Sequence, residues 1–454
     1  MRAEASGEQF AAQHQRCSAE RAMCERSPSR KLLHVSRMYS RMLAATEGLL
    51  IAHRRGYKVP WEPEIPGDWS ILFPHTVLAL ESRDAAWLDR ILTMAELEPS
   101  MVEPIVAGFG YVDREKLTGI VASLLESLSV RRREIGLRAC AEHRVATAAL
   151  VESQLAWAQR EGQPQITALA LLLAAVAGVS ALSPACLELC SDKDIQVSAA
   201  AAFASVLLGE RRHAIAPLAT VALRPGPMQD EALLLLLRVA DAKTCQATLK
   251  ALLARAQAPG APPHDKRLML LAAGYAGEVA ALDGLFAAME HPATARLAGA
   301  AFALITGADL AALDLDRPPP QQGVPGPTDD PADDDVELDP DTGAAWPDAA
   351  KVRAWWQQHA RRAPPGQRLL CGQPQSPHAA LDVLRTGFQH QRRVAAHDLA
   401  LLQPGRPLFH WFEPTWRQSA RMDALDALHG VERASAPRYV SVFARAALPG
   451  QAAS

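Results

Sequence analysis

The densest group of chemically capable side chains is an acidic stretch, DDPADDDVELDPD, at Asp329–Asp341, with eight acids in thirteen residues. Clustered carboxylates can hold Ca²⁺ or Mg²⁺, or they can offer an acidic ligand to a basic partner. The alternative is a solvated loop whose like charges repel one another. The spacing does not fit an EF-hand, so we assign no metal ligand, although a bound ion stays an alternative. The residues selected as partner contacts are Asp333, Asp334, Asp335 and Asp339.

Adjacent tryptophans follow the acidic stretch, in the short helical segment VRAWWQQH. Neighbouring positions on a helix are about 100° apart, so Trp355 and Trp356 cannot both lie at the centre of one face. We expect one ring to anchor the core and the other to cap a neighbouring element or to remain available to a partner. The predicted contact surface therefore also contains Trp355, Trp356 and the basic pair Arg392 and Arg393.

Arginine runs recur along the chain, which keeps nucleic-acid binding as an alternative. They stand at Arg131–Arg133, Arg211–Arg212, Arg361–Arg362 and Arg392–Arg393. They would form a basic stripe if successive repeats aligned them. The formal net charge of −3 and the nearby acidic stretch argue against this, so we expect nucleic acid not to be the partner.

No constellation typical of catalysis is evident, so we assign no catalytic residue and no cofactor. The histidines are scattered, and no G-x-S-x-G, H-E-x-x-H or phosphate-binding glycine loop occurs. Cys186 and Cys190 could place two thiolates on one helix face, but no second Cys or His pair follows at zinc spacing. We expect both to be small core residues. The seven cysteines lack the spacing of a disulfide framework, which favours a reducing compartment.

The elements that must position these residues are repeated helices. The stretch Asp192–Gly209 returns 99 residues later as His291–Gly307, which places Phe203 on Phe302. The shared apolar positions follow the i, i+3, i+4, i+7 spacing of one helix face. An offset of 99 divides into three units of about 33 residues, a length typical of two-helix repeats stacked into a solenoid.

Helix starts can be placed along the repeat from its periodicity and from turn residues. First helices are expected to begin near Met101, Arg131, Gln165, Ile195, Asp230, Lys266 and Thr294, and second helices near Arg114, Ala146, Pro184, His213, Thr244 and Val279. Gly209, Gly277 and Gly307 lie where helices are expected to stop. The fold predicted is all-α, an α-solenoid of HEAT-like helix pairs with an acidic loop and a helical C-terminal cap.

Composition shifts divide the chain into six regions. They are a disordered or frayed leader (1–30), an N-terminal helical region (31–84), the repeat array (85–313), the Pro- and Asp-rich acidic loop (314–345), a helical cap covering the open end of the array (346–418) and a weakly patterned tail (419–454). The leader lacks the apolar run of a secretory signal. The uncharged run Ile166–Leu182 is in phase with the repeat and is interpreted as a buried helix, so no membrane insertion is expected.

Specific segments carry a resemblance to a known family. Arg296 and the turn before it resemble the "DPxVRxxAAxALG" idiom of bacterial HEAT-like repeats. The runs RLAGAAFALITGADL, WPDAAKVRAWW, RLLCGQP and FQHQRRVAAHDLALLQPGRPLF resemble an uncharacterised bacterial family of HEAT-like conserved hypothetical proteins, over roughly residues 120–418. Members of that family are often encoded beside type VI secretion effectors and their adaptor proteins. The resemblance implies a cytoplasmic accessory or adaptor role.

The function predicted is a non-enzymatic protein-interaction scaffold or adaptor, with a secretion effector or its adaptor as the partner that the resemblance implies. A curved stack of helix pairs presents an extended concave surface that suits a protein ligand. Because HEAT-like folds also include alkylpurine DNA glycosylases and bilin lyases, an enzyme of the metal-assisted, lyase or glycosylase type is kept as an alternative.

Overall fold

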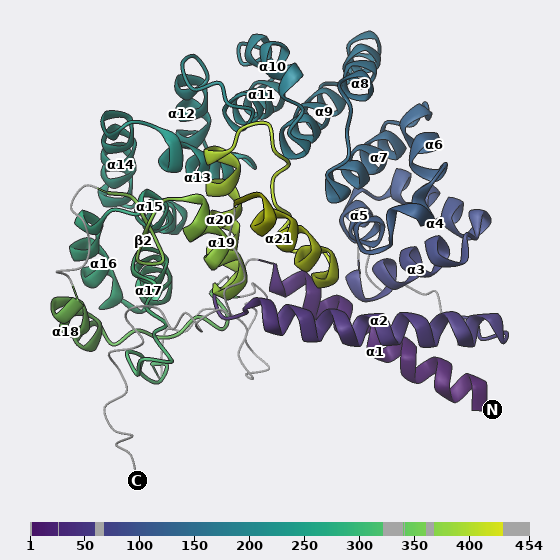
Figure 1. Cartoon of the computed structure of the whole chain (residues 1–454), viewed down its shortest axis with the longest axis horizontal. Coiled ribbons are helices and arrows are strands. Elements are labelled where there is room, and N and C mark those ends of the chain that lie inside the picture. The colour runs from purple at the N-terminus through teal and green to yellow at the C-terminus, as the bar shows by residue number, and fades with distance from the viewer. Residues whose placement is uncertain are drawn as a thin grey trace. The chain divides into compact units, whose positions relative to one another are not determined.

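The computed structural model describes residues 2–25, 27–59, 68–320, 339, 341–359 and 367–429. Within these residues the chain forms 21 α-helices and one two-stranded antiparallel sheet, so the predicted all-α class is confirmed (Figure 1). The chain divides into two compact units. Of the described residues, unit 1 takes those in 2–25, 31–217 and 403–421, and unit 2 takes those in 27–30, 218–402 and 422–429.

Unit 1 contains a row of five helices, α3, α5, α7, α9 and α11, in which each helix packs against the next. We call these its inner helices. A second set, the outer helices α6, α8 and α10, packs on α7, α9 and α11 respectively. The bounds are α1 Arg2–Cys24, α2 Leu32–Arg54, α3 Trp69–Ser82, α4 Ala85–Leu97, α5 Val102–Tyr111, α6 Ile120–Glu126, α7 Val130–His143, α8 Ala148–Glu161, α9 Pro164–Ala177, α10 Ser183–Leu189 and α11 Ile195–Leu207.

Unit 2 repeats this arrangement with the inner helices α13, α15 and α17 and the outer helices α14 and α16, which pack on α15 and α17. Helix α12, Ile215–Leu223, precedes them. The remaining bounds are α13 Gln229–Val239, α14 Ala242–Gln257, α15 Pro263–Ala276, α16 Leu282–Met289, α17 Pro292–Thr306, α18 Ala349–His359, β1 Leu369–Leu370, β2 Gln373–Pro374, α19 Pro377–Thr386, α20 Gln389–Leu402 and α21 Thr415–His429.

The 99-residue offset corresponds to equivalent inner helices. Phe203 lies in α11 and Phe302 in α17, and both rings are buried. Along the chain, α13 and α15 are the inner helices between them, so the offset spans three inner-helix steps of about 33 residues. The alanines at matching positions of the two helices, Ala199 and Ala202 in α11 and Ala298 and Ala301 in α17, are buried too, which lets the inner helices approach closely.

The helices that pack as pairs are not the pairs expected from the sequence, in which each first helix is grouped with the second helix that follows it. Each outer helix packs on the inner helix that follows it, as α8 does on α9, rather than on the one before it. Several inner helices end at residues of positive φ, such as Gly178 after α9 and Gly277 after α15, whereas α5 and α13 end at residues of negative φ. A left-handed residue at this position turns the chain out of the helix, so the next helix leaves the inner row.

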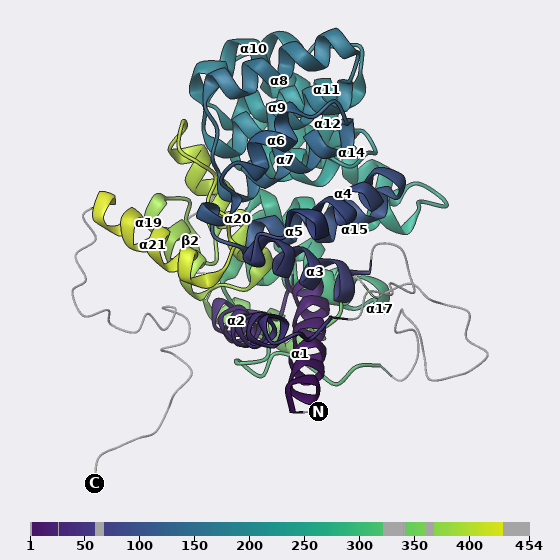
Figure 2. The same ribbon diagram turned by 90° about the vertical axis from the view of Figure 1, so that its right-hand side faces the viewer.

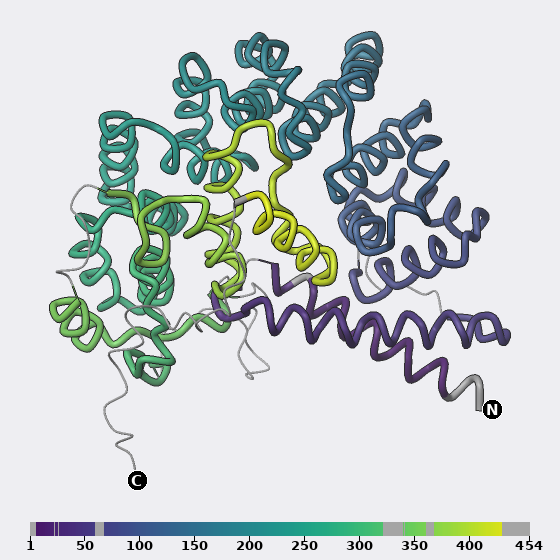
Figure 3. The backbone as a smooth tube through the Cα atoms, in the orientation of Figure 1, coloured from purple at the N-terminus to yellow at the C-terminus, as the bar shows by residue number. Residues whose placement is uncertain are grey.

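The predicted leader is a helix. Residues 2–24 form α1, which packs against α2 and α3 and buries Ala11, His14, Cys17 and Ser18. These side chains recur at helical spacing, but two of them are polar, so a search for apolar periodicity misses them. Figure 3 shows the chain reversing direction between α1 and α2. At the other end, α21 continues to His429, beyond the predicted start of the tail at 419.

The predicted cap is also placed differently. Helix α20 packs against α13 and α19, and β1 contacts α17, so residues 369–402 do not stack beyond α17 as a last repeat. The run Ile166–Leu182 forms α9 and a 3₁₀ turn, and Ile166, Ala170, Leu171 and Leu173 are buried in unit 1. None of the helices in the described part of the chain has the length and apolar character needed to cross a membrane.

A buried histidine gives unit 1 a specific pH dependence. His14 is fully buried, its Nε2 lies 2.9 Å from Thr46 Oγ1, and burial lowers its pKa to about 3. Because its unfolded-state pKa is near 6.5, only the unfolded chain takes up this proton as the pH falls from 6.5 towards 3. Acid in this window therefore removes stability from unit 1.

Urea unfolding at pH 7.5 and pH 5.0 tests this. We expect His14 to account for about 2 kcal/mol of the loss between these pH values, so His14→Gln reduces the pH dependence by that amount. His291→Gln, at an exposed position, is the control and keeps the wild-type pH dependence. An unchanged pH dependence in His14→Gln would contradict the assignment.

Candidate functional site

The C-terminal ends of the inner helices share one chemical requirement. The last four carbonyl groups of an α-helix have no partner within the helix, and they carry the negative end of its dipole. In both units, donors for these carbonyls come from residues 367–421, which we call the capping segment (Figure 3). The capping segment thus joins parts of the chain that lie far apart in the sequence through hydrogen bonds.

In unit 2 the capping segment meets α15 and α17 through its backbone. Leu369 N donates to Gly277 O at 2.8 Å, Cys371 N to Leu304 O at 2.7 Å and Gly372 N to Ile305 O at 2.8 Å. Strands β1 and β2 form the turn that presents these donors. A backbone hairpin thus completes the last turns of two helices.

This close approach explains the glycines at the helix ends. A Cβ on Gly277, where φ is +66°, would lie 2.4 Å from Leu369 O, and one on Gly307, where φ is +77°, would lie 2.5 Å from Cys371 O. Both the backbone conformation and the neighbouring carbonyl therefore exclude a side chain. From the sequence, we expect helices to end at these glycines. The structure shows a second reason for glycine at each position, which is the close approach of the capping segment.

A buried ion pair joins α13 to α20. Arg238 donates to both carboxylate oxygens of Asp398, at 2.7 Å from Nε and 2.5 Å from Nη2, and neither side chain is exposed. The remaining guanidinium nitrogen donates to the carbonyls of Tyr275 and Leu369. Gln375 Nε2 donates to Asp398 Oδ1 at 2.8 Å. The pair is two-pronged and has further partners, which offsets the cost of removing both charges from water.

A second charged group lies one turn away on α20. Arg393 pairs with Asp230 and Glu231 at 2.8 Å each, and His397 Nε2 lies 3.4 Å from Glu231. Burial alone would raise the pKa of Glu231, but the positive charge of Arg393 and the hydrogen bond from His397 hold it well below its usual range. The carboxylate stays ionised at neutral pH, which suits a permanent ion pair rather than proton transfer.

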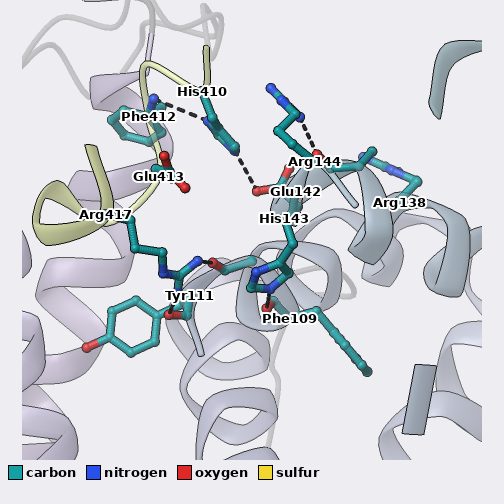
Figure 4. A network of polar contacts seen from close by, with 12 residues as sticks. Phe109, Tyr111, Arg138, Glu142, His143, Arg144, His410, Phe412, Glu413 and Arg417 are labelled. Atoms are coloured by element: carbon teal, nitrogen blue, oxygen red, sulfur yellow. Dashed lines mark hydrogen bonds and ion pairs between the residues drawn. The ribbon is translucent and has the colours of Figure 1, made fainter. Parts of the chain in front are cut away.

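In unit 1, the donors at the helix ends are an arginine side chain and a backbone amide, and Figure 4 shows the arginine, Arg417. Arg417 donates to three carbonyls at the end of α5, those of Gly110, Tyr111 and Val112. Leu408 N donates to Val176 O, in the last turn of α9, at 2.9 Å. A guanidinium placed at a helix C-terminus is favoured both by hydrogen bonding and by the helix dipole.

Arg144 holds the capping segment on α7. It has φ of +55°, in the left-handed region where α9 and α15 carry glycine, and its Nε donates to Leu408 O at 2.9 Å. Next to it, Glu142 pairs with His410 at 3.0 Å. Burial would raise the pKa of Glu142, but His410 and the arginines Arg21 and Arg144 lower it to about 2. The hydrogen bond from the Arg144 side chain to Leu408 offsets the strain of a non-glycine residue in the left-handed conformation.

The residues predicted from the sequence to contact a partner have different positions in the structure. Arg392 and Arg393 are buried in unit 2, at 0% and 4% exposure, which places them inside the fold rather than on a contact surface. Asp333, Asp334 and Asp335 lie outside the described residues. Asp339 is described, and both of its carboxylate oxygens accept hydrogen bonds from Arg296 on α17.

Asp339 belongs to an anchored end of the acidic stretch. Arg267 on α15 donates to both oxygens of Asp341, at 2.7 and 2.8 Å. Arg296 also stacks on Trp346, with its guanidinium carbon 4.6 Å from the ring centroid. The arginine that carried the resemblance to the repeat idiom thus fixes the end of the acidic stretch to α17.

The two tryptophans of α18 have different environments. Trp356 is 8% exposed and meets Phe302 edge to face, with ring centroids 6.3 Å apart. Trp355 is partly buried against the same core and stacks on His359 at 4.2 Å. One ring therefore anchors the core, as predicted, and the other covers a neighbouring side chain.

The first arginine run is engaged within unit 1. Arg131 pairs with Glu134, Arg132 pairs with Glu96 and Asp89, and Arg133 lies 3.9 Å above the ring of Trp157. These contacts neutralise or cover the charges that a basic stripe would need.

Sequence reasoning missed the pairs Arg238–Asp398 and Glu142–His410, because their partners stand 160 and 268 residues apart. One signal was present: Arg238 follows directly after a run of five leucines in α13, where an unpaired charge would be costly. Within the described residues, no group of three or more His, Cys, Asp or Glu side chains is arranged to hold a metal ion. No protein-family model, curated protein or solved structure matches the chain.

Substitution of the helix-end glycines tests the close approach. Gly260→Ala is the control, because Gly260 has φ of +72° and open space around it, and we expect it to cost about 1 kcal/mol. Gly277→Ala adds a clash with Leu369 and is expected to cost at least about 2 kcal/mol more in urea unfolding. Equal losses in the two variants would show that the capping segment does not press on α15.

Removal of one partner tests the buried ion pair. Asp398→Asn leaves the Arg238 charge without its counter-charge, and we expect a loss of about 3–5 kcal/mol in the free energy of unfolding. The double variant Arg238→Met/Asp398→Leu is expected to recover the part of this loss that comes from the uncompensated charge, but not the part that comes from the Arg238 hydrogen bonds to Tyr275 and Leu369. Arg255→Met, which breaks a partly exposed pair with Asp265, should cost less than about 1 kcal/mol. A loss of that small size in Asp398→Asn would be the contradicting result.

Proposed function

We propose that this chain is a protein-interaction scaffold or adaptor, built as an α-solenoid of HEAT-like helix pairs. The observation that carries the proposal is the repeated packing of an outer helix on the next inner helix in both units. Stacked pairs of this kind give a framework whose exposed surface is large relative to its core, and such frameworks are suited to binding proteins. The α-helical class supports the proposal without deciding what is bound.

The contacts of the capping segment support a structural role, rather than a catalytic one, for the polar networks. Arg238, Arg417 and Arg144 donate to helix-end carbonyls, and the carboxylates beside Arg238 and Arg144 are paired. These groups consolidate the inner helices, and a stiff framework loses little entropy when it binds a partner. Because the inner-helix ends are occupied by the chain itself, the proposal assigns partner binding to other faces of each unit.

The partner class comes from the resemblance of the chain to a family encoded beside type VI secretion genes. We propose that the partner is a type VI effector or the adaptor that loads it, and that binding takes place in the cytoplasm before export. The proposal treats the chain as non-enzymatic, so its effect on the partner is to hold or deliver it.

Affinity purification from the native host tests this proposal. The tagged full-length chain is expected to recover an effector or adaptor encoded near its own gene in roughly equal amounts. The purified pair should then elute together in size-exclusion chromatography. The tag alone and an unrelated helical protein carrying the same tag are the controls. Recovery of no neighbouring gene product above these controls would overturn the proposed function.

A further inference from the structure

Helix α2 of unit 1 leaves one long face uncovered. It packs on α1 and α3 (Figures 1 and 2). Its buried side includes Val35, Tyr39, Met42 and Leu49. The opposite side is exposed and runs from Leu33 to Arg55. We call this the α2 face, and its members are Leu33, Arg37, Ser40, Arg41, Leu43, Ala44, Glu47, Ile51, Arg54 and Arg55.

The centre of the α2 face has the spacing of a helix-packing seam. Leu33, Arg37, Ser40, Ala44, Glu47 and Ile51 follow one another at alternating steps of four and three residues. This alternation keeps one stripe of a helix in contact with a second helix along its length. Ser40 and Ala44 are small, so a second helix could approach closely at the middle of the seam.

The seam exposes aliphatic side chains at both ends. Leu33 is 58% exposed and Ile51 is 51% exposed, and Leu43, beside the seam, is 39% exposed. A single exposed aliphatic residue needs no explanation. Here, apolar anchors at the two ends of one seam, about 27 Å apart by the rise of an α-helix, define a contact for a helix of about five turns.

The charge of the α2 face is strongly positive. It carries four arginines and one glutamate, and Lys58 lies exposed just beyond it. Arg41 pairs with Glu20, whereas Arg37, Arg54 and Arg55 form no ion pair with any described residue. In contrast, Arg131, Arg132 and Arg138 of the same unit are all paired. Unpaired arginines along an exposed seam favour a binding partner that carries carboxylates on the surface facing them.

We propose that the α2 face is a docking surface for an acidic, amphipathic helix of a protein partner. The partner's apolar side chains would cover Leu33 and Ile51, and its carboxylates would face Arg37 and Arg55. This inference rests on the proposed function, and it names the surface and the chemistry of the partner.

Two other occupants fit the α2 face less well. A helix that lies in a membrane surface separates its apolar and basic side chains onto opposite sides, whereas here Leu33, Arg37 and Glu47 share one stripe. Nucleic acid would use the arginines but would leave Leu33 and Ile51 without an apolar counterpart. A protein helix satisfies both the charge and the apolar anchors.

A charge-reversal experiment with defined probes tests the recognition chemistry. The probes are a helical peptide of about 24 residues with Leu along its seam and Glu beside it, and the same peptide with Lys in place of Glu. At low salt, the full-length chain is expected to bind the Glu peptide and not the Lys peptide. Arg37→Glu/Arg55→Glu should weaken binding of the Glu peptide about tenfold or more.

The matched control is Arg160→Glu, which reverses an exposed charge on α8 and should leave peptide binding unchanged. These positions are exposed, and Arg55 and Arg160 both lie at helix C-terminal ends, so the double variant and the control are expected to show small and similar decreases in unfolding temperature. Equal binding of the Glu peptide by wild type and the double variant would overturn the inference. So would tighter binding of phosphatidylserine vesicles or of random duplex DNA than of the Glu peptide.

Photo-crosslinking in the native host separates this inference from the proposed function. A benzophenone amino acid at Ser40 is expected to capture a partner through a peptide of net negative charge, whereas the same group at Glu152 on α8 is not. Capture from Glu152 alone would overturn the α2 assignment while leaving a scaffold role intact. Failure of the tagged wild-type chain to recover any neighbouring gene product would overturn the proposed function, and the α2 inference with it.

Discussion

The structure depends on hydrogen-bond donors at the C-terminal ends of its inner helices. When helices stand side by side in a row, their free carbonyl groups and dipole ends gather along one edge. Each unit meets this requirement with the capping segment, through backbone amides in unit 2 and through the Arg417 side chain and the Leu408 amide in unit 1. Water could satisfy the same carbonyls, but a covalently attached segment also excludes water and buries Leu370 and Phe412.

This constraint explains where charge is buried and why it is tolerated. Arg238 donates to the carbonyls of Tyr275 and Leu369 from a position that is buried from water. Burial of its positive charge is unfavourable unless a negative charge lies beside it, and Asp398 provides that charge. The same reasoning applies to Glu142, whose pKa falls to about 2 beside His410 and Arg144. Such groups fix one arrangement of the capping segment, and the Glu142 carboxylate stays ionised near neutral pH.

Because the capping segment covers the C-terminal ends of the inner helices, those ends are not available to a partner. The sequence pointed to a concave surface and to Arg392 and Arg393, yet both arginines are buried by α20 and its neighbours. The α2 face has what those residues lack, namely unpaired charge and exposed aliphatic side chains on one seam. A partner-binding surface is best sought where the chain has not already covered its own side chains.

The sequence by itself determined the helices of the repeat, because alanine-rich stripes, proline starts and glycine stops are local signals; the Phe203–Phe302 offset fell on equivalent inner helices. It missed α1, whose buried face includes His14 and Ser18. Only the tertiary structure decided that outer helices pack on the inner helix that follows and that Asp398 meets Arg238. Periodicity records which side of a helix avoids water, but it carries no information on which distant segment supplies the cover or the counter-charge.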